Sequence, residues 1–276
     1  MKKNLLYSAL LISSLTIIFI ACTKNDPPPV VTPTVVKEWA ILLAAKYENN
    51  PPAGRTETGT VSLKLLSDNS ITYTITVVGL ASGDVLTAAH IHTGDAISNG
   101  PVILGFDPAF TGSSAQGTIT NIRSTFVDSL KDDVNELYFN VHSTQVPGGL
   151  IRGQVNTDIE MAEYVTLTGT NEVPSVTTTA TGTALIRLTS EKKIYIKEII
   201  TNLEPGDALI ASHIHQAAVG VNGSVILGFY SGAADFGTVK VSTLTDAQYT
   251  SIKTDPIYVN AHSTNHPAGI VRTQIR

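Results

Sequence analysis

Apolar and polar residues alternate along much of the chain with the two-residue period of a β-strand. In residues 71–77, apolar side chains at odd positions are separated by threonines at even positions, which is typical of a strand with one buried face. Residues 185–188 and 194–200 form another pair of such segments, joined by a polar turn at 190–193. Glycine, asparagine and proline separate the segments and favour tight turns. The pattern predicts an all-β fold of short antiparallel strands.

Two short stretches break this alternation and predict helices. Thr245 and Gln248 have the spacing of a capping box, in which each side chain bonds the backbone amide of the other residue. Tyr249 and Ile252 follow on one helical face. Residues 125–130 contain a weaker form of the same pattern, with Thr125 in the capping position. We expect both helices to connect strands without carrying chemistry.

The second half of the chain repeats the first. Residues 88–106 read AAHIHTGDAISNGPVILGF, and residues 211–229 read ASHIHQAAVGVNGSVILGF. A second matched block pairs residues 136–155 with residues 256–275. Because the repeat is about 120 residues long, well above the period of a solenoid, each copy should be a whole domain. We expect the two domains to span residues 37–157 and 162–276.

The N-terminal residues have the pattern of an export signal. Residues 1–21 combine two lysines with an apolar stretch that ends just before Cys22, as in a secretory signal peptide. The residues before Cys22 resemble the lipobox of bacterial lipoproteins, which implies that Cys22 is lipidated and becomes the mature N-terminus. Residues 22–36 are rich in proline, which disfavours helices and central strands and predicts an extended tether.

The N-terminal residues also predict where the protein is located, and the composition predicts which class of partner it can bind. Residues 24–26 resemble the surface-export signal of Bacteroidetes lipoproteins, which implies a lipid anchor in the outer membrane of a Gram-negative bacterium, facing the periplasm or the surface. Cys22 is the only cysteine, so neither an intramolecular disulfide nor a cysteine metal site can form. A formal net charge of −5 makes nucleic acid an unfavourable partner.

All seven histidines fall in the repeated blocks, and six of them recur at matched positions. Residues two apart in a strand share a face, so both histidines of each His-Ile-His triplet point the same way, with the isoleucine opposed. The second block adds a histidine, an asparagine, an arginine and a glutamine on faces that a hairpin would bring together. The candidate set is His90, His92, His142, Asn140, Arg152 and Gln154 in copy one, and His213, His215, His262, Asn260, Arg272 and Gln274 in copy two.

Two interpretations of this set remain open. Three histidines from two strands could bind copper or zinc, with asparagine or glutamine orienting the ligands. Alternatively, the same polar side chains could satisfy one another in a hydrogen-bonded network without metal. Arg152 and Arg272 count against a metal, since a guanidinium close to a cation is unfavourable.

Taken together, these motifs resemble the CHRD domain, the module first described in chordin. The resemblance rests on Gly-Asp before each His-Ile-His, Asn-Gly before the next strand, Asn-x-His-Ser, and a terminal Pro-x-Gly-x-x-Arg-x-Gln. In copy two it also includes residues 171–174, Asn-Glu-Val-Pro, from which residues 47–51 of copy one depart. The resemblance implies two tandem immunoglobulin-like antiparallel β-sandwich or barrel domains in an extracytoplasmic protein.

The resemblance implies little about activity, and three function classes stay open. We expect a membrane-anchored, non-catalytic binding module whose loops contact a protein or a glycan. The alternative is a copper- or zinc-binding protein with one three-histidine site per domain. A metalloenzyme similar to copper-zinc superoxide dismutase is a third class, but the further metal ligands and the disulfide of that enzyme are missing from this sequence.

Overall fold

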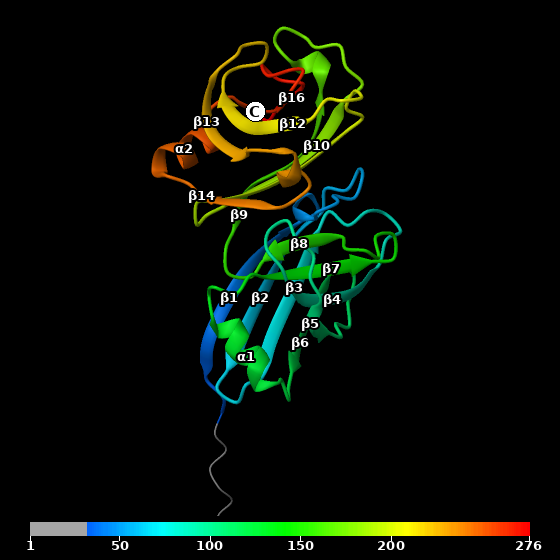
Figure 1. The fold of residues 1–276 in the computed structure, drawn as a ribbon. Helices are drawn as coiled ribbons and strands as arrows, with labels where there is room; N and C mark the ends of the chain where they lie inside the picture. The colour runs from blue at the N-terminus through cyan, green and yellow to red at the C-terminus, as the bar shows by residue number, and fades with distance from the viewer. Residues whose placement is uncertain (1–31) are drawn as a thin grey trace, which may run out of the picture. The chain divides into compact units, whose positions relative to one another are not determined.

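The computed structural model describes residues 32–276, and the predicted signal peptide and Cys22 lie outside the described residues. Each sequence repeat forms one curved, barrel-like antiparallel sheet of eight strands (Figure 1). The predicted fold class, two tandem all-β domains, is therefore confirmed. Among the described residues, no helix is long and apolar enough to cross a membrane.

The first sheet has the strand order β5-β4-β7-β8-β1-β2-β3-β6. Its strands are β1 (Val35–Ala44), β2 (Thr58–Leu66), β3 (Ile71–Val78), β4 (Leu86–Thr93), β5 (Val102–Phe106), β6 (Ser114–Ile119), β7 (Leu137–Ser143) and β8 (Ile151–Gln154). A short 3-10 turn, η1 (Ala45–Tyr47), follows β1. The first strand begins at Val35, inside the segment that the proline content assigns to the tether (22–36).

The second sheet repeats this order as β13-β12-β15-β16-β9-β10-β11-β14. Its strands are β9 (Ile159–Thr168), β10 (Thr181–Thr189), β11 (Lys193–Thr201), β12 (Leu209–Gln216), β13 (Ser224–Tyr230), β14 (Lys240–Thr243), β15 (Ile257–Ser263) and β16 (Val271–Gln274). The 3-10 turns are η2 (Gly169–Asn171), after β9, and η3 (Ala233–Asp235). The sequence repeat is thus a repeat of topology, in which β4 corresponds to β12 and β7 to β15.

One short helix interrupts each copy. The helix α2 (Asp246–Thr254) has the predicted capping box, with the Gln248 amide donating to the Thr245 hydroxyl at 3.3 Å and the Thr245 amide donating to the Gln248 side chain at 3.0 Å. The helix α1 (Ser124–Lys131) begins one residue before the predicted cap, and Arg123 at its N-cap makes no capping hydrogen bond. The weaker pattern in copy one therefore predicted the helix but not its first residue.

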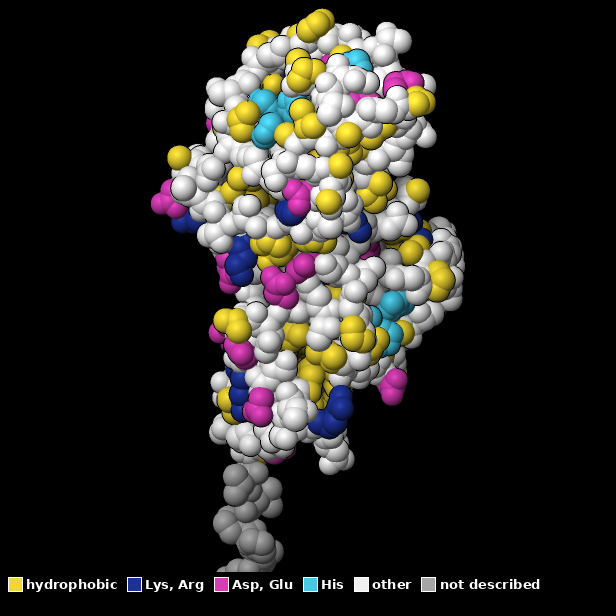
Figure 2. Space-filling view, in the orientation of Figure 1, with side chains coloured by type: hydrophobic (Ala, Val, Ile, Leu, Met, Phe, Trp, Pro, Cys, Tyr) yellow, Lys and Arg dark blue, Asp and Glu magenta, His cyan; other side chains and the backbone are white. Residues whose placement is uncertain are grey.

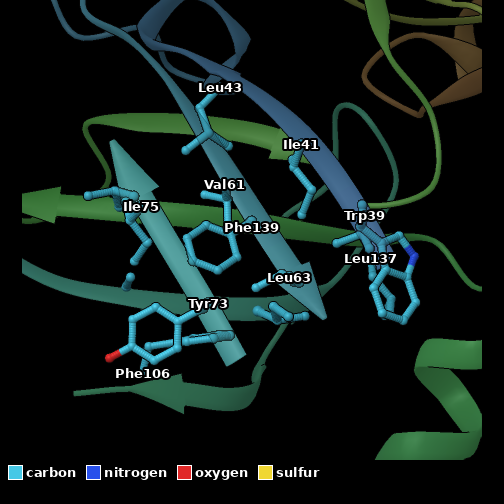
Figure 3. Packing of buried hydrophobic residues seen from close by; sticks show 14 of the residues in the cluster. Trp39, Ile41, Leu43, Val61, Leu63, Tyr73, Ile75, Phe106, Leu137 and Phe139 are labelled. Carbon is cyan, nitrogen blue, oxygen red and sulfur yellow. The ribbon is translucent and has the colours of Figure 1, made fainter. Parts of the chain in front are cut away.

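The alternation in β3 builds the core of the first domain. Its odd-numbered residues are buried, and Tyr73 packs edge-on against Phe106 with ring centroids 5.1 Å apart. Figure 3 shows these two rings together with Ile75 and Phe139 inside the curve of the sheet. Burying each such side chain contributes roughly 1.5–3 kcal/mol. Apolar burial therefore holds the sheet in the curvature on which the outward-facing residues depend.

The core of the second domain differs from that of the first by containing an ionisable residue. Glu198 in β11 takes the place of Ile75 in β3, since each lies four residues after the first paired residue of an equivalent hairpin. The residues that it contacts across the domain are also more polar, with Ser212 and Tyr230 paired where the first domain pairs Ala89 and Phe106. Glu198 is fully buried, and burial raises its pKa to about 8.

Replacing Glu198 with glutamine should flatten the pH dependence of stability. The carboxyl has a pKa near 4.5 when unfolded and about 8 when folded, so its favourable contribution is complete below pH 4.5 and is lost as the pH rises towards 8. We expect Glu198→Gln to raise the free energy of unfolding at pH 8 by about 2–4 kcal/mol, with little change at pH 5. Denaturant unfolding at both pH values measures this, with exposed Glu191→Gln as the control. An unchanged pH slope would contradict it.

Candidate metal centres

Strand β4 places the histidines of the first domain on the outer face of its sheet. Ile91 is fully buried in the core, so His90 and His92 on either side of it point outward, as the two-residue period requires. In the register with β7, Asn140 lies opposite His90 and Tyr138 opposite His92, while His142 pairs with Ala88 beside them. Figure 2 shows histidine side chains reaching the surface in each domain.

The three histidines of each copy converge. One ring nitrogen from each of them lies within 4.8 Å of the others in both groups. The Nδ1 atom of His90 is 3.0 Å from the Nε2 atom of His142, and His213 and His262 are 3.0 Å apart through the same two atoms. Copper and zinc bond imidazole nitrogens at about 2.0–2.1 Å, so small side-chain rotations would bring all three nitrogens onto one ion.

Backbone carbonyls fix the tautomer of two histidines in each site. The Nδ1 atom of His92 is 2.9 Å from the carbonyl oxygen of Gly100, and that of His142 is 2.9 Å from the carbonyl oxygen of Pro147. A carbonyl can only accept, so each Nδ1 carries the proton and each Nε2 keeps its lone pair. The second domain repeats both contacts, from His215 to Gly223 at 3.0 Å and from His262 to Pro267 at 3.1 Å. Holding one imidazole nitrogen by a carbonyl is the usual arrangement around a metal-binding histidine.

The first site also leaves two buried acceptors without a donor. Among the described residues, the Nε2 atom of His92 and the Oδ1 atom of Asn140 have no hydrogen-bond partner. The Asn140 amide nitrogen donates to the Oε1 atom of Glu48 at 2.6 Å, which fixes the amide orientation and leaves Oδ1 bare. In the second domain the equivalent atoms also lack a hydrogen bond of good geometry, but Asn260 lies close enough to His215 to raise its pKa through a hydrogen bond. Buried acceptors of this kind are unfavourable unless a proton donor or a cation meets them.

The imidazoles are held in the neutral form that a metal ligand needs. Burial is the largest cause that lowers the pKa of all six histidines from the usual 6.5, and it outweighs the carbonyl hydrogen bonds, which raise the pKa of two histidines in each site. For His92 and His215, the positive charges of Arg152 and Arg272 lower the pKa further. Neutral imidazole is the form that binds copper and zinc.

Arg152 lies near the site but is separated from the histidines by an aromatic ring. Its guanidinium carbon is 3.4 Å from the centroid of the Tyr138 ring, while His92 stacks on Tyr138 at 4.7 Å with 8° between the planes. The guanidinium also donates to the side-chain oxygen of Asn99 and to the carbonyl oxygens of Asp95 and Ser98, at 2.8, 2.5 and 2.8 Å. Arg152 therefore fastens the loop whose Gly100 carbonyl holds His92.

The second domain contains the same stack. Arg272 is 3.3 Å from the centroid of the Tyr258 ring, and His215 stacks on that ring at 4.7 Å with 4° between the planes. Arg272 donates to Asn222 Oδ1 at 3.0 Å and to the carbonyl oxygen of Val221 at 2.8 Å. In both copies a buried arginine therefore fixes, through hydrogen bonds, the loop between the His-Ile-His strand and the next strand.

The polar set predicted from the sequence thus divides into three parts. The histidines form one group, the asparagines contact a buried glutamate, and the arginines and glutamines hold the loop. Gln154 donates to the carbonyl oxygen of Gly94 at 3.1 Å, and Gln274 to that of Ala217 at 3.0 Å. Backbone carbonyls, in place of the asparagine or glutamine side chains that the sequence suggested, hold the Nδ1 atoms of two histidines in each site. In the second domain Asn260 also forms a hydrogen bond to His215.

Glu48 and Glu172 are site residues that the sequence interpretation missed. Each follows the 3-10 turn after the first strand of its domain and is buried, and burial raises the pKa of each carboxyl to about 7. Asn140 donates to Glu48, and Asn260 is hydrogen-bonded to Glu172. Glu172 lies within the Asn-Glu-Val-Pro motif. Its equivalence to Glu48 was hidden because the residues around Glu48 do not match that motif.

The CHRD domain model matches residues 40–155 and residues 164–275. The chain belongs to the CHRD family. Its two tandem CHRD domains each include one complete three-histidine group. No curated protein and no solved structure matches the chain.

Gly149 should be essential to the first CHRD domain because it lies against the glutamate–asparagine pair. Its φ of +134° disfavours any side chain, and an added Cβ would lie 2.8 Å from the Asn140 amide nitrogen and 2.9 Å from Glu48 Oε1. We expect Gly149→Ala to destabilise the protein by about 2 kcal/mol or more in denaturant unfolding. The neighbouring Gly148→Ala is the matched control, since its added Cβ would contact nothing within 4 Å. Equal effects of the two substitutions would contradict the proposed packing.

Proposed function

We propose that this CHRD protein is an extracytoplasmic, membrane-anchored binding protein in which each CHRD domain holds one copper or zinc ion through three histidines. The observation that carries the proposal is the convergence of three neutral imidazoles in both domains, with the tautomers of two fixed by backbone carbonyls. Convergence of lone pairs is what a cation requires and what a purely hydrogen-bonded network avoids.

The hydrogen-bonded alternative leaves its acceptors unsatisfied. His90 can donate its Nδ1 proton to His142 across 3.0 Å, so that one contact needs no ion. The Nε2 atom of His92 and the Oδ1 atom of Asn140 still have no donor among the described residues. Protonating His92 would supply one, but burial and Arg152 both oppose that charge. A metal ion ligated by the imidazoles would satisfy the histidine lone pair, and a water bound to it could donate to the asparagine.

The donor set favours a transition metal such as copper or zinc over calcium or magnesium. Imidazole nitrogens suit both ions, and three neutral nitrogens without a carboxylate or thiolate do not suit calcium or magnesium. The affinity of such sites generally rises from zinc to copper(II). Three protein ligands also leave at least one coordination position for water or another small ligand.

The location of the protein is a part of the proposal that rests on sequence. Cys22 after an apolar leader supports a lipid anchor, and the proline-rich residues that follow support a tether between membrane and first domain. We propose attachment to the outer membrane of a Gram-negative bacterium. The outward loops of both domains stay accessible in this arrangement to a protein or glycan partner.

The loaded chain should contain two equivalents of metal. We expect the mature protein, loaded with copper or zinc and dialysed, to retain two ions by elemental analysis, one after His92→Ala or His215→Ala, and none after both. His266→Ala is the matched control, because His266 is the one histidine outside the two groups. A wild-type protein that retains no metal after loading would refute the proposal.

Metal affinity should decrease only when the pH falls below 6.5, the ordinary pKa of histidine. Burial lowers the pKa of the six histidines below 6.5, so protons do not compete for the ligands at neutral pH and begin to compete as the pH drops below 6.5. We expect a nearly constant affinity between pH 8 and 6.5, followed by a steep loss, in chelator competition titrations. Affinity that persists to pH 4 would contradict an all-histidine ligand set.

A further inference from the structure

Each proposed metal site has an aromatic ring sandwiched between a metal-binding imidazole and a guanidinium. In the first domain the layers are His92, Tyr138 and Arg152, and in the second they are His215, Tyr258 and Arg272. The distances in the two copies agree to 0.1 Å at the guanidinium and coincide at the imidazole. The loop, the arginine and the ring are therefore one unit, reproduced in each domain.

The arginine in this stack is a buried positive charge without a paired carboxylate. Arg152 is fully buried and Arg272 is 2% exposed. Among the described residues, neither forms a salt bridge, and their acceptors are carbonyl and amide oxygens. The nearest acidic groups that act on Arg152 are Glu48 and Asp95, and Glu48 is itself hydrogen-bonded to Asn140. Because burial raises the pKa of Glu48 to about 7, this carboxyl offsets the field of the guanidinium at the histidine group only in part below pH 7.

We propose that Arg152 and Arg272, acting through Tyr138 and Tyr258, bias the two metal sites towards the ion of lower charge, so that each binds Cu(I) in preference to Cu(II). This inference rests on the proposed function, because it concerns the ion held by the same histidines. The arginines do not touch the metal in this proposal. They are positioning residues whose charge acts through the ring stacked on the ligand.

The guanidinium sets the preference between the ions, and the ring sets the geometry of the ligand. The guanidinium is separated from a ligand imidazole by one aromatic ring. A positive charge at a separation of about 10 Å and an effective dielectric constant of about 20 opposes each additional unit of metal charge and favours Cu(I) over Cu(II) by about tenfold. The guanidinium also draws on the electron density of the ring through a cation–π contact. The ring in turn holds the plane of the imidazole, which keeps its lone pair directed at the site.

The test uses a protein in which only the first site binds copper. In a His213→Ala/His215→Ala background, competition titrations give the Cu(I) and Cu(II) dissociation constants, and voltammetry gives the reduction potential. We expect Arg152→Gln to strengthen Cu(II) binding relative to Cu(I) by about tenfold and to lower the reduction potential. Arg152→Lys keeps the charge and should retain most of the wild-type ratio.

Arg272→Gln in the same background is the matched control. It removes an equivalent buried arginine from the domain whose site has been disabled, so the copper ratio of the first site should not change. Circular dichroism and denaturant unfolding show whether each variant is folded. The reciprocal experiment, Arg272→Gln in a His90→Ala/His92→Ala background, repeats the test with an arginine that makes fewer hydrogen bonds than Arg152.

The outcomes separate this inference from the proposed function. If copper binds through the histidines but the Cu(I)-to-Cu(II) ratio is unaffected by the arginine of the same domain, the inference is wrong and the proposed function stands. If the control variant shifts the ratio equally, the effect belongs to net charge and the inference is also wrong. If the wild-type protein binds no copper, the proposed function fails first. Should neither glutamine variant fold, a wild-type reduction potential below that of aqueous copper overturns the inference.

Discussion

The two-residue period of the His-Ile-His strand is the constraint on which both the core and the site depend. Ile91 and Ile214 are fully buried in their domains, and this burial sets which face of the strand turns outward. A slip of one residue would carry the histidines into the core and the isoleucine into solvent. The hydrophobic core therefore specifies the register of the candidate site, although none of the core residues in 32–276 forms a hydrogen bond to a histidine nitrogen.

The loop after this strand adds the second level of order. The carbonyl of Gly100 or Gly223 in this loop selects the tautomer of the second histidine of the triplet. A buried arginine donates hydrogen bonds to other carbonyls of the loop. Burying a guanidinium without a paired carboxylate is unfavourable. Here hydrogen bonds to neutral oxygens and close contact with a tyrosine face offset that penalty. While Glu48 and Glu172 are protonated, the arrangement leaves a net positive charge beside the histidines. This charge is the basis for assigning a preference between oxidation states.

The two domains share their outer site more closely than their cores. The stacks and histidine contacts repeat within 0.2 Å, whereas Ile75 in one core is replaced by Glu198 in the other. Apolar packing tolerates different side chains of suitable volume. A set of converging nitrogens is far less tolerant, since small displacements remove a ligand. The close match of the outer site is what a shared binding role would require.

The sequence by itself determined the all-β class, the two copies, the capped helix and the shared face of the histidines, because each follows from local periodicity or direct repetition. It also indicated which residues of the second block lie on one face. Only the tertiary structure decided that Asn140 meets Glu48, 92 positions away, and that Tyr138 separates Arg152 from His92. It likewise decided that carbonyls, rather than amide side chains, orient the imidazoles. Those contacts depend on the paths of loops and turns between strands, which carry no periodic signal in the sequence.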